Sequence, residues 1–363
     1  MHPAPVVLHI IWSAEIGGIS KVVWQLCAAQ RNSDAVQPML YIAQPKGDLL
    51  QEIERSDVTI VKGAFLHGAL CTPAHFADIA KLMKKADILH FHTFNPVLAF
   101  CAVRSGKRIV YTEHGNFGFG RKFGIAERII RRLQRRFLNK SVRAISFNSR
   151  FSLLESETRN GLRHVRKEVI YNGVEDTAYL ESGSQSQSDS DTLRIAAIGR
   201  LVNVKRFDRI LRTLSLVNKE NVHLTIMGDG PLREEIGEIA QELHLGNKVQ
   251  FAGSGNGKQL LQQSDLCIVG SQGEAFGLVA VEAYQQGIPV LTFCDGGGVT
   301  EIVQAIAPEH ICKDECAMAE LVTKFAEDKK NHILLRSDSL RTYAHGFSMQ
   351  KMQDHFNQLY RSL

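Results

Sequence analysis

The sequence predicts an α/β protein of two doubly wound, Rossmann-like domains that face a central cleft. Short apolar runs rich in Val, Ile and Leu alternate with amphipathic segments of helix length, and this alternation occurs in two successive series. A serine-rich segment without bulky apolar residues, 181–192, separates the series and is expected to be a flexible linker. Open α/β sheets bind ligands at the carboxyl ends of their strands, so the functional site is expected in the cleft.

The predicted strands are buried and parallel, because each is a continuous apolar run rather than an alternating one. The first series places strands at 6–11, 39–42, 88–91, 108–112 and 143–147. The second series places them at 193–198, 222–227, 249–251, 266–269 and 289–293. A chain of 363 residues is long enough to give each series its own core.

Composition and charge exclude several classes of protein. The 29 glycines and 9 prolines follow no period, which excludes a collagen-like chain, and a hydrophobic content of 44% excludes extended disorder. No apolar run approaches the roughly 20 residues that cross a bilayer. The N-terminus lacks the basic region of a secretory signal, so we expect the protein in the cytoplasm.

The seven cysteines favour neither a disulfide framework nor a structural zinc site. They are odd in number, scattered, and without a CxxC pair. We expect them to be small buried hydrophobic residues. They are Cys27, Cys71, Cys101, Cys267, Cys294, Cys312 and Cys316.

Three strand-to-helix turns could meet a phosphate. Gly17 and Gly18 follow the first predicted strand, where backbone N–H groups can approach an anion, although a tight turn explains them equally well. Arg200 and Lys205 follow the first strand of the second series and could together hold a diphosphate; the alternative is two solvated surface cations. Gly228 begins a GDGP turn after the next strand, which favours close backbone approach.

Two glutamates eight positions apart follow the strand at 266–269. Glu274 falls in the loop and Glu282 in the next helix, which is otherwise apolar. A carboxylate on such a helix needs hydrogen-bond donors. The hydroxyl groups of a sugar or a ribose are donors of this kind.

Histidines gather near the ends of two strands of the first series. His90 and His92 are two positions apart and therefore share one face, and His114 follows the next strand. A zinc site is the alternative, but neither cysteine nor HExxH spacing supports it. We expect His114 to be a polar residue of the cleft and His90 to belong to the core.

The basic residues are concentrated in 121–143, which holds nine basic residues and one acidic residue, a net charge of +8. The chain carries +5, so the other 340 residues carry −3, and nucleic-acid binding is not indicated. Apolar residues recur there at helical spacing, which predicts an amphipathic helix. It either packs on its own domain or docks on an anionic membrane surface. The candidate docking residues are Arg131, Arg132, Arg135 and Arg136.

Seven weak motifs occur in one order along nearly the whole chain. They are GGIS at 17–20, YTEHG at 111–115, SFNSRF at 146–151, VIYNGV at 169–174, GRLVNVKR at 199–206, GDGP at 228–231 and EAFGLVAVE at 274–282. This pattern resembles the retaining GT-B glycosyltransferases of family 4, whose E-x7-E motif the last of them matches.

The resemblance implies that 193–346 binds a nucleotide sugar, most often UDP-linked in this family. Domain 1–180, completed by a C-terminal helix over 347–363, would bind the acceptor, a lipid-linked glycan, cell-surface polysaccharide or lipopolysaccharide. By motif, Glu282 would hold the ribose, Glu274 and the backbone of Phe276, Gly277 and Leu278 the donor sugar, and Arg200 and Lys205 the diphosphate. Gly18 would close the phosphate site and His114 would lie by the anomeric centre. Outside the serine-rich linker 181–192 no DxD motif is present, so no metal is expected.

Two alternatives remain open. A GT-B sugar-nucleotide epimerase would share the fold, and a catalytically silent nucleotide-sugar-binding scaffold would share the binding residues.

The sequence departs from the family after Glu301, where it reads IVQAIAPEHICKD in place of the usual Asp-Gly turn. With a cationic helix in the acceptor domain, we expect a peripheral protein on the inner face of the cell membrane.

Overall fold

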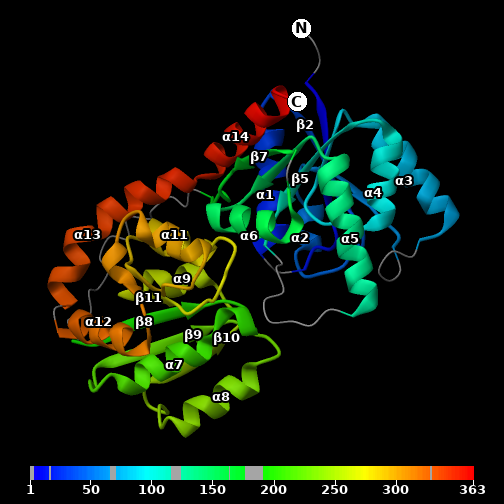
Figure 1. Cartoon of the computed structure of the whole chain (residues 1–363). Coiled ribbons are helices and arrows are strands. Elements are labelled where there is room, and N and C mark those ends of the chain that lie inside the picture. Colours follow the sequence, from blue (N-terminus) through cyan, green and yellow to red (C-terminus); the bar gives the residue numbers. More distant parts are fainter. Residues whose placement is uncertain are drawn as a thin grey trace. The chain divides into compact units, whose positions relative to one another are not determined.

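The structure is a computed structural model that describes residues 4–15, 18–65, 71–115, 124–162, 164–175, 191–327 and 329–363. The chain divides into two compact units, Met1–Glu175 together with Ser348–Leu363, and Asp176–Phe347. Each unit contains one parallel sheet with helices packed against it (Figure 1). The predicted class, α/β with two doubly wound sheets, is confirmed. The central cleft stays a prediction.

The first unit is built on a sheet of order β3-β2-β1-β4-β5-β6-β7. Its strands are β1 (Val6–Ile11), β2 (Gln37–Ile42), β3 (Thr59–Lys62), β4 (Ile88–Phe91), β5 (Arg108–Glu113), β6 (Ala144–Phe147) and β7 (Arg166–Val169). Its helices are α1 (Gly18–Arg31), α2 (Leu50–Glu54), α3 (Pro73–Lys85), α4 (Pro96–Ser105), α5 (Ile125–Lys140), α6 (Arg150–Asn160) and α14 (Met349–Arg361). The connections reverse direction between β1 and β4, which makes these two strands the switch point of the sheet.

Local sequence explains where several helices of this unit begin and end. Asn95 caps α4 by accepting hydrogen bonds from the next turn, Pro96 fits its first position, and Gly106 ends it in a left-handed conformation. Ser348 caps α14 in the same way. Helix α14 contacts α1 and buries Phe356 and Tyr360 within this unit.

The second unit has the sheet order β10-β9-β8-β11-β12-β13. Its strands are β8 (Leu193–Ile198), β9 (Val222–Met227), β10 (Val249–Gly253), β11 (Leu266–Val269), β12 (Val290–Phe293) and β13 (Ile311–Cys312). Its helices are α7 (Phe207–Leu216), α8 (Arg233–Glu242), α9 (Gly257–Gln262), α10 (Leu278–Gln285), α11 (Gly298–Gln304), α12 (Glu315–Glu327) and α13 (Lys329–Ala344). Here the switch point lies between β8 and β11.

The expectation that all cysteines are buried holds for four of the seven. Cys294 and Cys316 are exposed and Cys71 is half-buried, while the other four are buried; all seven are free thiols. Cys294 follows β12 directly and Cys316 lies in the first turn of α12. Both residues thus lie at the end of an element, where a side chain can reach the surface.

No helix in the described part of the chain is long and apolar enough to span a bilayer.

Candidate functional site

The switch point of the second sheet brings a cation and a carboxylate together. Lys205 lies in a short 3-10 helix after β8 (η1, Asn203–Lys205), and Glu274 lies in the loop after β11. The Lys205 Nζ atom is 2.5 Å from Glu274 Oε1, and both side chains are 18% exposed. The two residues are 69 positions apart, so the adjacency of β8 and β11 is what joins them.

Glu274 remains ionised in this environment. Burial acts to raise the pKa of its carboxyl group, but the charge and hydrogen bond of Lys205 and the hydroxyl of Ser271 outweigh it, so the pKa is lowered. Ser271 is fully buried and was not recognised from the sequence, because a lone serine in a loop carries no motif. A fixed ammonium beside a charged carboxylate is a preorganised electrostatic element.

Glycines allow the loops of this edge to approach closely, as their motifs indicated. A Cβ atom on Gly228 would lie 2.0 Å from the carbonyl oxygen of Gly199, so this turn after β9 requires glycine. Gly277 has a φ of +105° at the start of α10, and a Cβ there would lie 2.5 Å from Val299 Cγ2. The Glu274 loop is tied to the loop after β12, since Gly298 N donates to the Glu274 carbonyl oxygen at 2.7 Å.

The remaining residues predicted for the donor lie along the same sheet edge. Arg200 is exposed directly after β8, and Phe276 is buried before α10, whereas Leu278 is half-buried at the first position of that helix. Glu282 is half-buried on α10. Burial is the main cause that raises the pKa of the Cys267 thiol to about 12, and the negative charge of the nearby Glu282 is the second. The structure therefore brings Lys205 and Glu274 into contact, and the roles of the other residues stay predictions.

A histidine cluster lies at the switch point of the first sheet, with His9, His90 and His92 buried and His114 half-buried. His9 on β1 is 3.0 Å from His92 (Nδ1 to Nε2), and His92 is 3.0 Å from His114 (Nδ1 to Nε2). His9 and His90 are partners in the register of β1 with β4, which explains why the cluster forms. The sequence singled out His90, His92 and His114 but missed His9, which stands alone in an apolar run.

Hydrogen bonds account for every ring nitrogen of the three innermost histidines. His9, His90 and His92 each bring one ligand atom within 4.8 Å of the others, a spacing that could hold a metal ion. Each of their six ring nitrogens, however, lies within hydrogen-bonding distance of another side chain. The zinc alternative would require these bonds to break, so the cluster is better described as a hydrogen-bond network.

The network predicts that the first unit loses stability in acid. Burial, only partly offset by the Gln30 hydrogen bond, lowers the pKa of His9 from 6.5 to about 4 in the folded protein. Between pH 6.5 and about pH 4, the unfolded chain binds more protons than the folded one, so the free energy of unfolding falls as the pH falls. At about 1.4 kcal/mol per pKa unit, His9 alone would cost about 3 kcal/mol by pH 4.

Tryptophan fluorescence during urea unfolding measures this effect, because Trp12 and Trp24, the chain's two tryptophans, lie in the first unit. The His9→Asn variant should have a shallower pH dependence, whereas replacement of the exposed His223 with asparagine should leave the dependence unchanged. A free energy of unfolding that stays constant from neutral pH to about pH 4 would contradict the prediction.

Gly18 is the first residue of α1 and is exposed, while Gly17 lies outside the described residues. In the first turn of α1, the Ser20 hydroxyl donates to the Ser13 carbonyl oxygen at 2.9 Å, which ties the helix to the residues after β1. Gly18 is thus at a helix N-terminus, as the phosphate interpretation requires.

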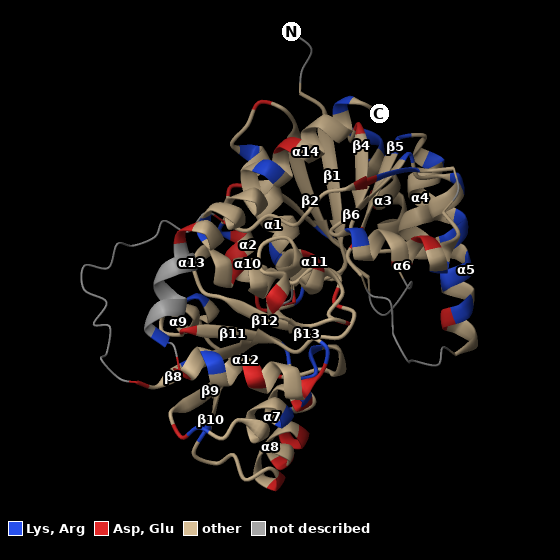
Figure 2. Ribbon diagram, turned by 60° about the vertical axis from the view of Figure 1, so that its left-hand side comes forward, with Lys and Arg blue, Asp and Glu red and all other residues tan. Residues whose placement is uncertain are grey.

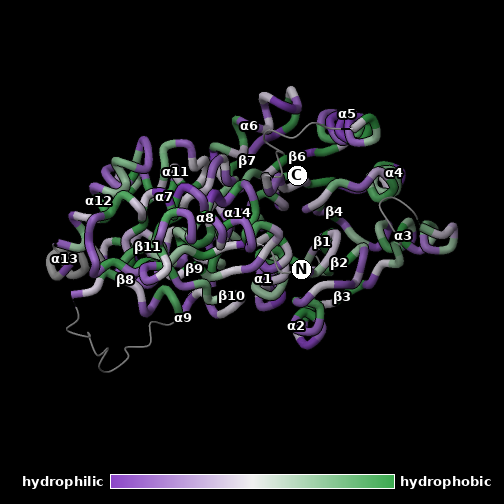
Figure 3. The backbone as a smooth tube through the Cα atoms, turned by 90° about the horizontal axis from the view of Figure 1, so that it is seen from below, coloured by the Kyte–Doolittle hydropathy of each residue, from purple (hydrophilic) through white to green (hydrophobic). Residues whose placement is uncertain are grey.

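Helix α5 carries the predicted cationic surface. Arg132, Arg135 and Arg136 are exposed and Arg131 is half-buried. Basic residues follow the helix along much of its length in Figure 2, and Figure 3 shows hydrophobic residues interspersed with hydrophilic ones. Large apolar side chains are also exposed on it, namely Ile125, Ile129, Ile130 and Leu133, from 42 to 72%. Only Phe137 and Leu138 are buried on α5 within the described chain, so most of the helix does not pack on its own unit.

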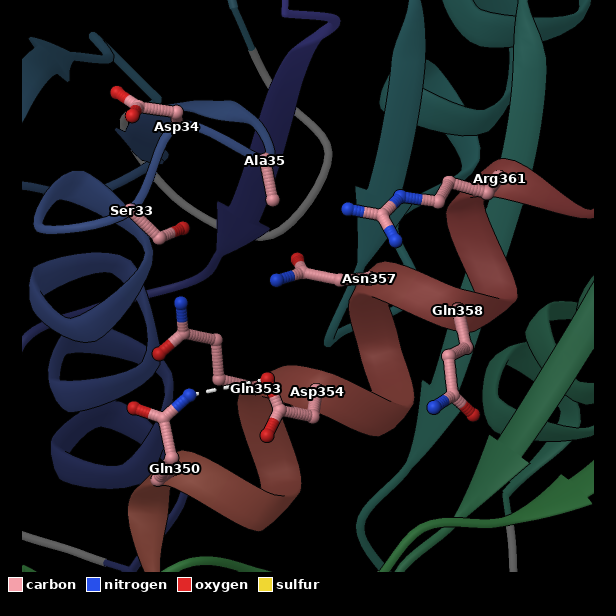
Figure 4. A pocket seen from close by; sticks show the side chains of 9 residues that line it. All are labelled: Ser33, Asp34, Ala35, Gln350, Gln353, Asp354, Asn357, Gln358 and Arg361. Atoms are coloured by element: carbon pink, nitrogen blue, oxygen red, sulfur yellow. Dashed lines mark hydrogen bonds between the residues drawn. The ribbon is translucent and has the colours of Figure 1, made fainter.

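A separate cavity of about 430 Å³ lies between α14 and the turn after α1. Its lining is made mostly of amide and carboxylate side chains that converge from the two elements (Figure 4). It contains none of the motif residues and lies beside the turn that leads into β2, at the amino end of that strand. It is therefore not the ligand site expected at the carboxyl ends of the strands.

Comparison with solved structures supports the fold. HepE of Anabaena, solved with UDP-glucose, has a TM-score of 0.83 at 19% identity and covers 99% of this chain and 100% of its own. WaaG, a glycosyltransferase involved in lipopolysaccharide biosynthesis, has a TM-score of 0.73 at 16% identity, with 97% and 99% covered. Both likenesses show a shared GT-B fold.

Curated relatives match part of the chain. The N-acetyl-alpha-D-glucosaminyl L-malate synthase of Bacillus anthracis is 25% identical over 206 residues, 53% of each chain. The lipopolysaccharide core biosynthesis glycosyltransferase LpsD of Rhizobium meliloti is 26% identical over 176 residues, 48% of this chain and 51% of its own. The match thus spans about half the length of these relatives.

Family models match both halves of the sequence. The model described as Glycosyltransferase Family 4 matches residues 16–178, and the model described as Glycosyl transferases group 1 matches residues 181–339. Together with the two doubly wound sheets and the motifs placed on them, these matches show that the chain belongs to glycosyltransferase family 4.

Proposed function

We propose that this protein is a retaining hexosyltransferase that uses a UDP-sugar as donor and acts without a metal ion. The observation that carries the proposal is the Lys205–Glu274 pair at the switch point of the second sheet, with Glu282 of the E-x7-E motif on the adjoining helix. The solved complex of HepE with UDP-glucose supports UDP as the nucleotide. A ligand at this point of an α/β sheet is the general expectation for the fold.

The second unit would stabilise the leaving group. When the bond between the sugar carbon and the phosphate oxygen breaks, negative charge develops on the diphosphate, which the guanidinium of Arg200 and the ammonium of Lys205 can stabilise. The ammonium is already fixed by Glu274 at 2.5 Å, so it needs little reorganisation during the reaction. In a front-side attack, the acceptor oxygen bonds to the sugar carbon and its proton passes to the departing phosphate.

The two glutamates would divide the recognition of the donor. Glu282 would accept hydrogen bonds from the ribose hydroxyls, and Glu274 with the backbone of Phe276, Gly277 and Leu278 would bind the hexose. The lowered pKa of Glu274 supports this, because an ionised carboxylate is a strong acceptor for sugar hydroxyls.

Replacement of Glu282 with alanine tests the donor site. A hydrogen bond to a charged group is worth about 1.5–3 kcal/mol, so the affinity for UDP should fall about 10- to 100-fold in calorimetric titration. The exposed Glu238 on α8 is a matched control, and its replacement with alanine should leave UDP affinity unchanged. Equal UDP affinity of the Glu282→Ala variant and the wild type would overturn this assignment.

The acceptor is proposed to be a lipid-linked or cell-surface glycan, such as a polysaccharide or lipopolysaccharide precursor. Curated relatives include LpsD and the GPI3 subunit of phosphatidylinositol N-acetylglucosaminyltransferase, whose names refer to lipid-bearing acceptors. The exposed apolar and cationic side chains of α5 would dock the protein on the anionic cytoplasmic face of the membrane, where such acceptors reside.

Product analysis separates this proposal from its two alternatives. A glycosyltransferase releases UDP and forms a glycoside, whereas an epimerase releases an epimerised sugar without glycoside formation. A silent scaffold would bind the nucleotide sugar without turnover. The charged residues that leaving-group stabilisation requires are all present, which favours the transferase.

A further inference from the structure

A chain of hydrogen-bonded side chains leads from α1 to His114. His9 Nε2 lies 2.9 Å from Gln30 Oε1, and the contacts from His9 to His92 and from His92 to His114 are both 3.0 Å. Gln30, His9 and His92 are buried. His114 follows β5, so the chain ends at the carboxyl edge of the sheet, where α/β proteins bind ligands.

The orientation of the Gln30 amide sets the direction of this chain. A carbonyl oxygen only accepts hydrogen bonds, so His9 donates from Nε2. A neutral imidazole carries one N–H, so His9 Nδ1 then accepts from His92 Nε2, and His92 Nδ1 accepts from His114 Nε2. His114 therefore carries its proton on Nε2, and its Nδ1 atom keeps a lone pair.

The imidazole rings of His9, His92 and His114 are neutral. Burial lowers the pKa of His9 and of His114 to about 4, with a partial offset from Gln30 at His9. Burial, together with the neighbouring histidines, also lowers the pKa of His92 well below its usual value.

Tyr360 of α14 joins the histidine network beside Gln30. Burial raises the pKa of Tyr360 well above its usual value, and the Gln30 side chain opposes this rise. The Gln30 amide oxygen is the atom that contacts His9, whereas the amide nitrogen forms no hydrogen bond within the described part of the chain. The Tyr360 hydroxyl lies 2.6 Å from His90 Nδ1, and His90 Nε2 lies 2.7 Å from Thr112 Oγ1.

We propose that His9 and His92 are positioning residues that present His114 Nδ1 as a hydrogen-bond acceptor to a hydroxyl group of the bound carbohydrate. The inference rests on the proposed function, and it adds His114 to the substrate site because His114 follows β5 at the carboxyl edge of the first sheet. Without the chain, the His114 ring can rotate or change tautomer and offer an N–H group instead. Gln30 anchors the far end, so the tautomer of His114 is set by an amide three hydrogen bonds away.

The alternative is that these histidines only fill the core. Burial of polar rings costs free energy unless every nitrogen is hydrogen-bonded, and apolar side chains of similar size would pack without that demand. A packing role predicts that loss of His92 changes stability alone. A positioning role predicts that it changes the protonation pattern of His114.

The matched variants His92→Asn and His92→Leu distinguish the two roles. Asparagine and leucine have nearly the same shape, but only asparagine offers an oxygen near the position of His92 Nδ1, where it can accept from His114 Nε2. Nitrogen NMR of ¹⁵N-histidine-labelled protein reports which ring nitrogen is protonated, and the His114→Gln variant identifies the His114 signals. We expect His114 to be protonated on Nε2 in the wild type and in His92→Asn, and to lose this preference in His92→Leu.

Kinetics provide the second readout. When the contact of His114 with the carbohydrate is misplaced, kcat should fall about 10- to 100-fold in His92→Leu, and the KM for the UDP-sugar should stay nearly unchanged. The His92→Asn variant should restore most of the activity. Ser146→Ala is the control, because the Ser146 hydroxyl is hydrogen-bonded to Thr112, which leads to His90 and not along the route from Gln30 to His114.

Two NMR results would overturn the proposal: a wild-type His114 that carries its proton on Nδ1, or a His114 tautomer that is the same in His92→Leu as in the wild type. An absence of turnover with any nucleotide sugar would refute the proposed function instead, and the NMR result would still decide whether the chain sets the tautomer.

Discussion

Replacement of Lys205 with alanine is expected to lower kcat/KM for the nucleotide sugar about 100- to 1,000-fold. Loss of one preorganised donor to a developing negative charge has an effect of this size. The variant loses the ammonium that Glu274 holds at 2.5 Å, so only the exposed Arg200 remains of the two cations assigned to the leaving diphosphate. Steady-state UDP release, with the unfolding temperature measured in parallel, checks the prediction.

Two further variants separate catalysis from stability. Lys205→Ala leaves the half-buried carboxylate of Glu274 without its counter-ion, which destabilises the second unit. The double variant Lys205→Ala/Glu274→Gln removes the unpaired charge and should recover stability but not activity. Lys219→Ala, which breaks the exposed ion pair of Lys219 with Glu327, should retain full activity. A Lys205→Ala enzyme with wild-type kcat/KM would refute the leaving-group role.

Replacement of Arg131, Arg132, Arg135 and Arg136 with alanine should nearly abolish binding to anionic vesicles. Each basic residue near an anionic surface contributes about 1 kcal/mol, so four of them correspond to about a thousandfold in affinity. Co-sedimentation with vesicles of phosphatidylcholine and phosphatidylglycerol measures this loss. Binding of the wild type should also weaken as salt is added, because screening shortens the range of the attraction.

A variant with the same loss of charge controls for net charge. Arg55, Lys81, Lys84 and Lys85 are exposed in the same unit, outside α5. Their joint replacement with alanine removes four positive charges and should reduce binding far less than the α5 variant. Equal losses in both variants would show that general charge attracts the protein to vesicles and that α5 is not the docking surface.

The strands predicted correctly are those whose burial on both faces requires a continuous apolar run, such as β1 and β8. Strands β3, β7 and β13 were missed. Strands β3 and β7 occupy the two edges of the first sheet, are mostly half-buried, and carry charged residues such as Lys62 and Arg166. Strand β13 is an edge strand of two residues, too short to leave a pattern.

The contacts inside the sites could not be predicted from the sequence alone. The spacing of the motifs placed Lys205 and Glu274 at the ends of two strands, but their pairing depends on the neighbouring positions of β8 and β11. Likewise, the link from His9 to His92 depends on how β1 pairs with β4, since His9 carries no motif of its own. Sequence patterns identify residue types at strand ends, and strand order decides which of them meet.

The central claim is that the protein transfers a hexose from a UDP-sugar to a hydroxyl group of a glycan or glycolipid. The most direct test is to incubate the purified protein with a panel of nucleotide sugars and a lipid and glycan extract, and to follow UDP release and new glycosides by mass spectrometry. We predict UDP release together with a glycoside that retains the anomeric configuration of the donor. Turnover of no nucleotide sugar, or formation of an epimerised sugar without a glycoside, would contradict the claim.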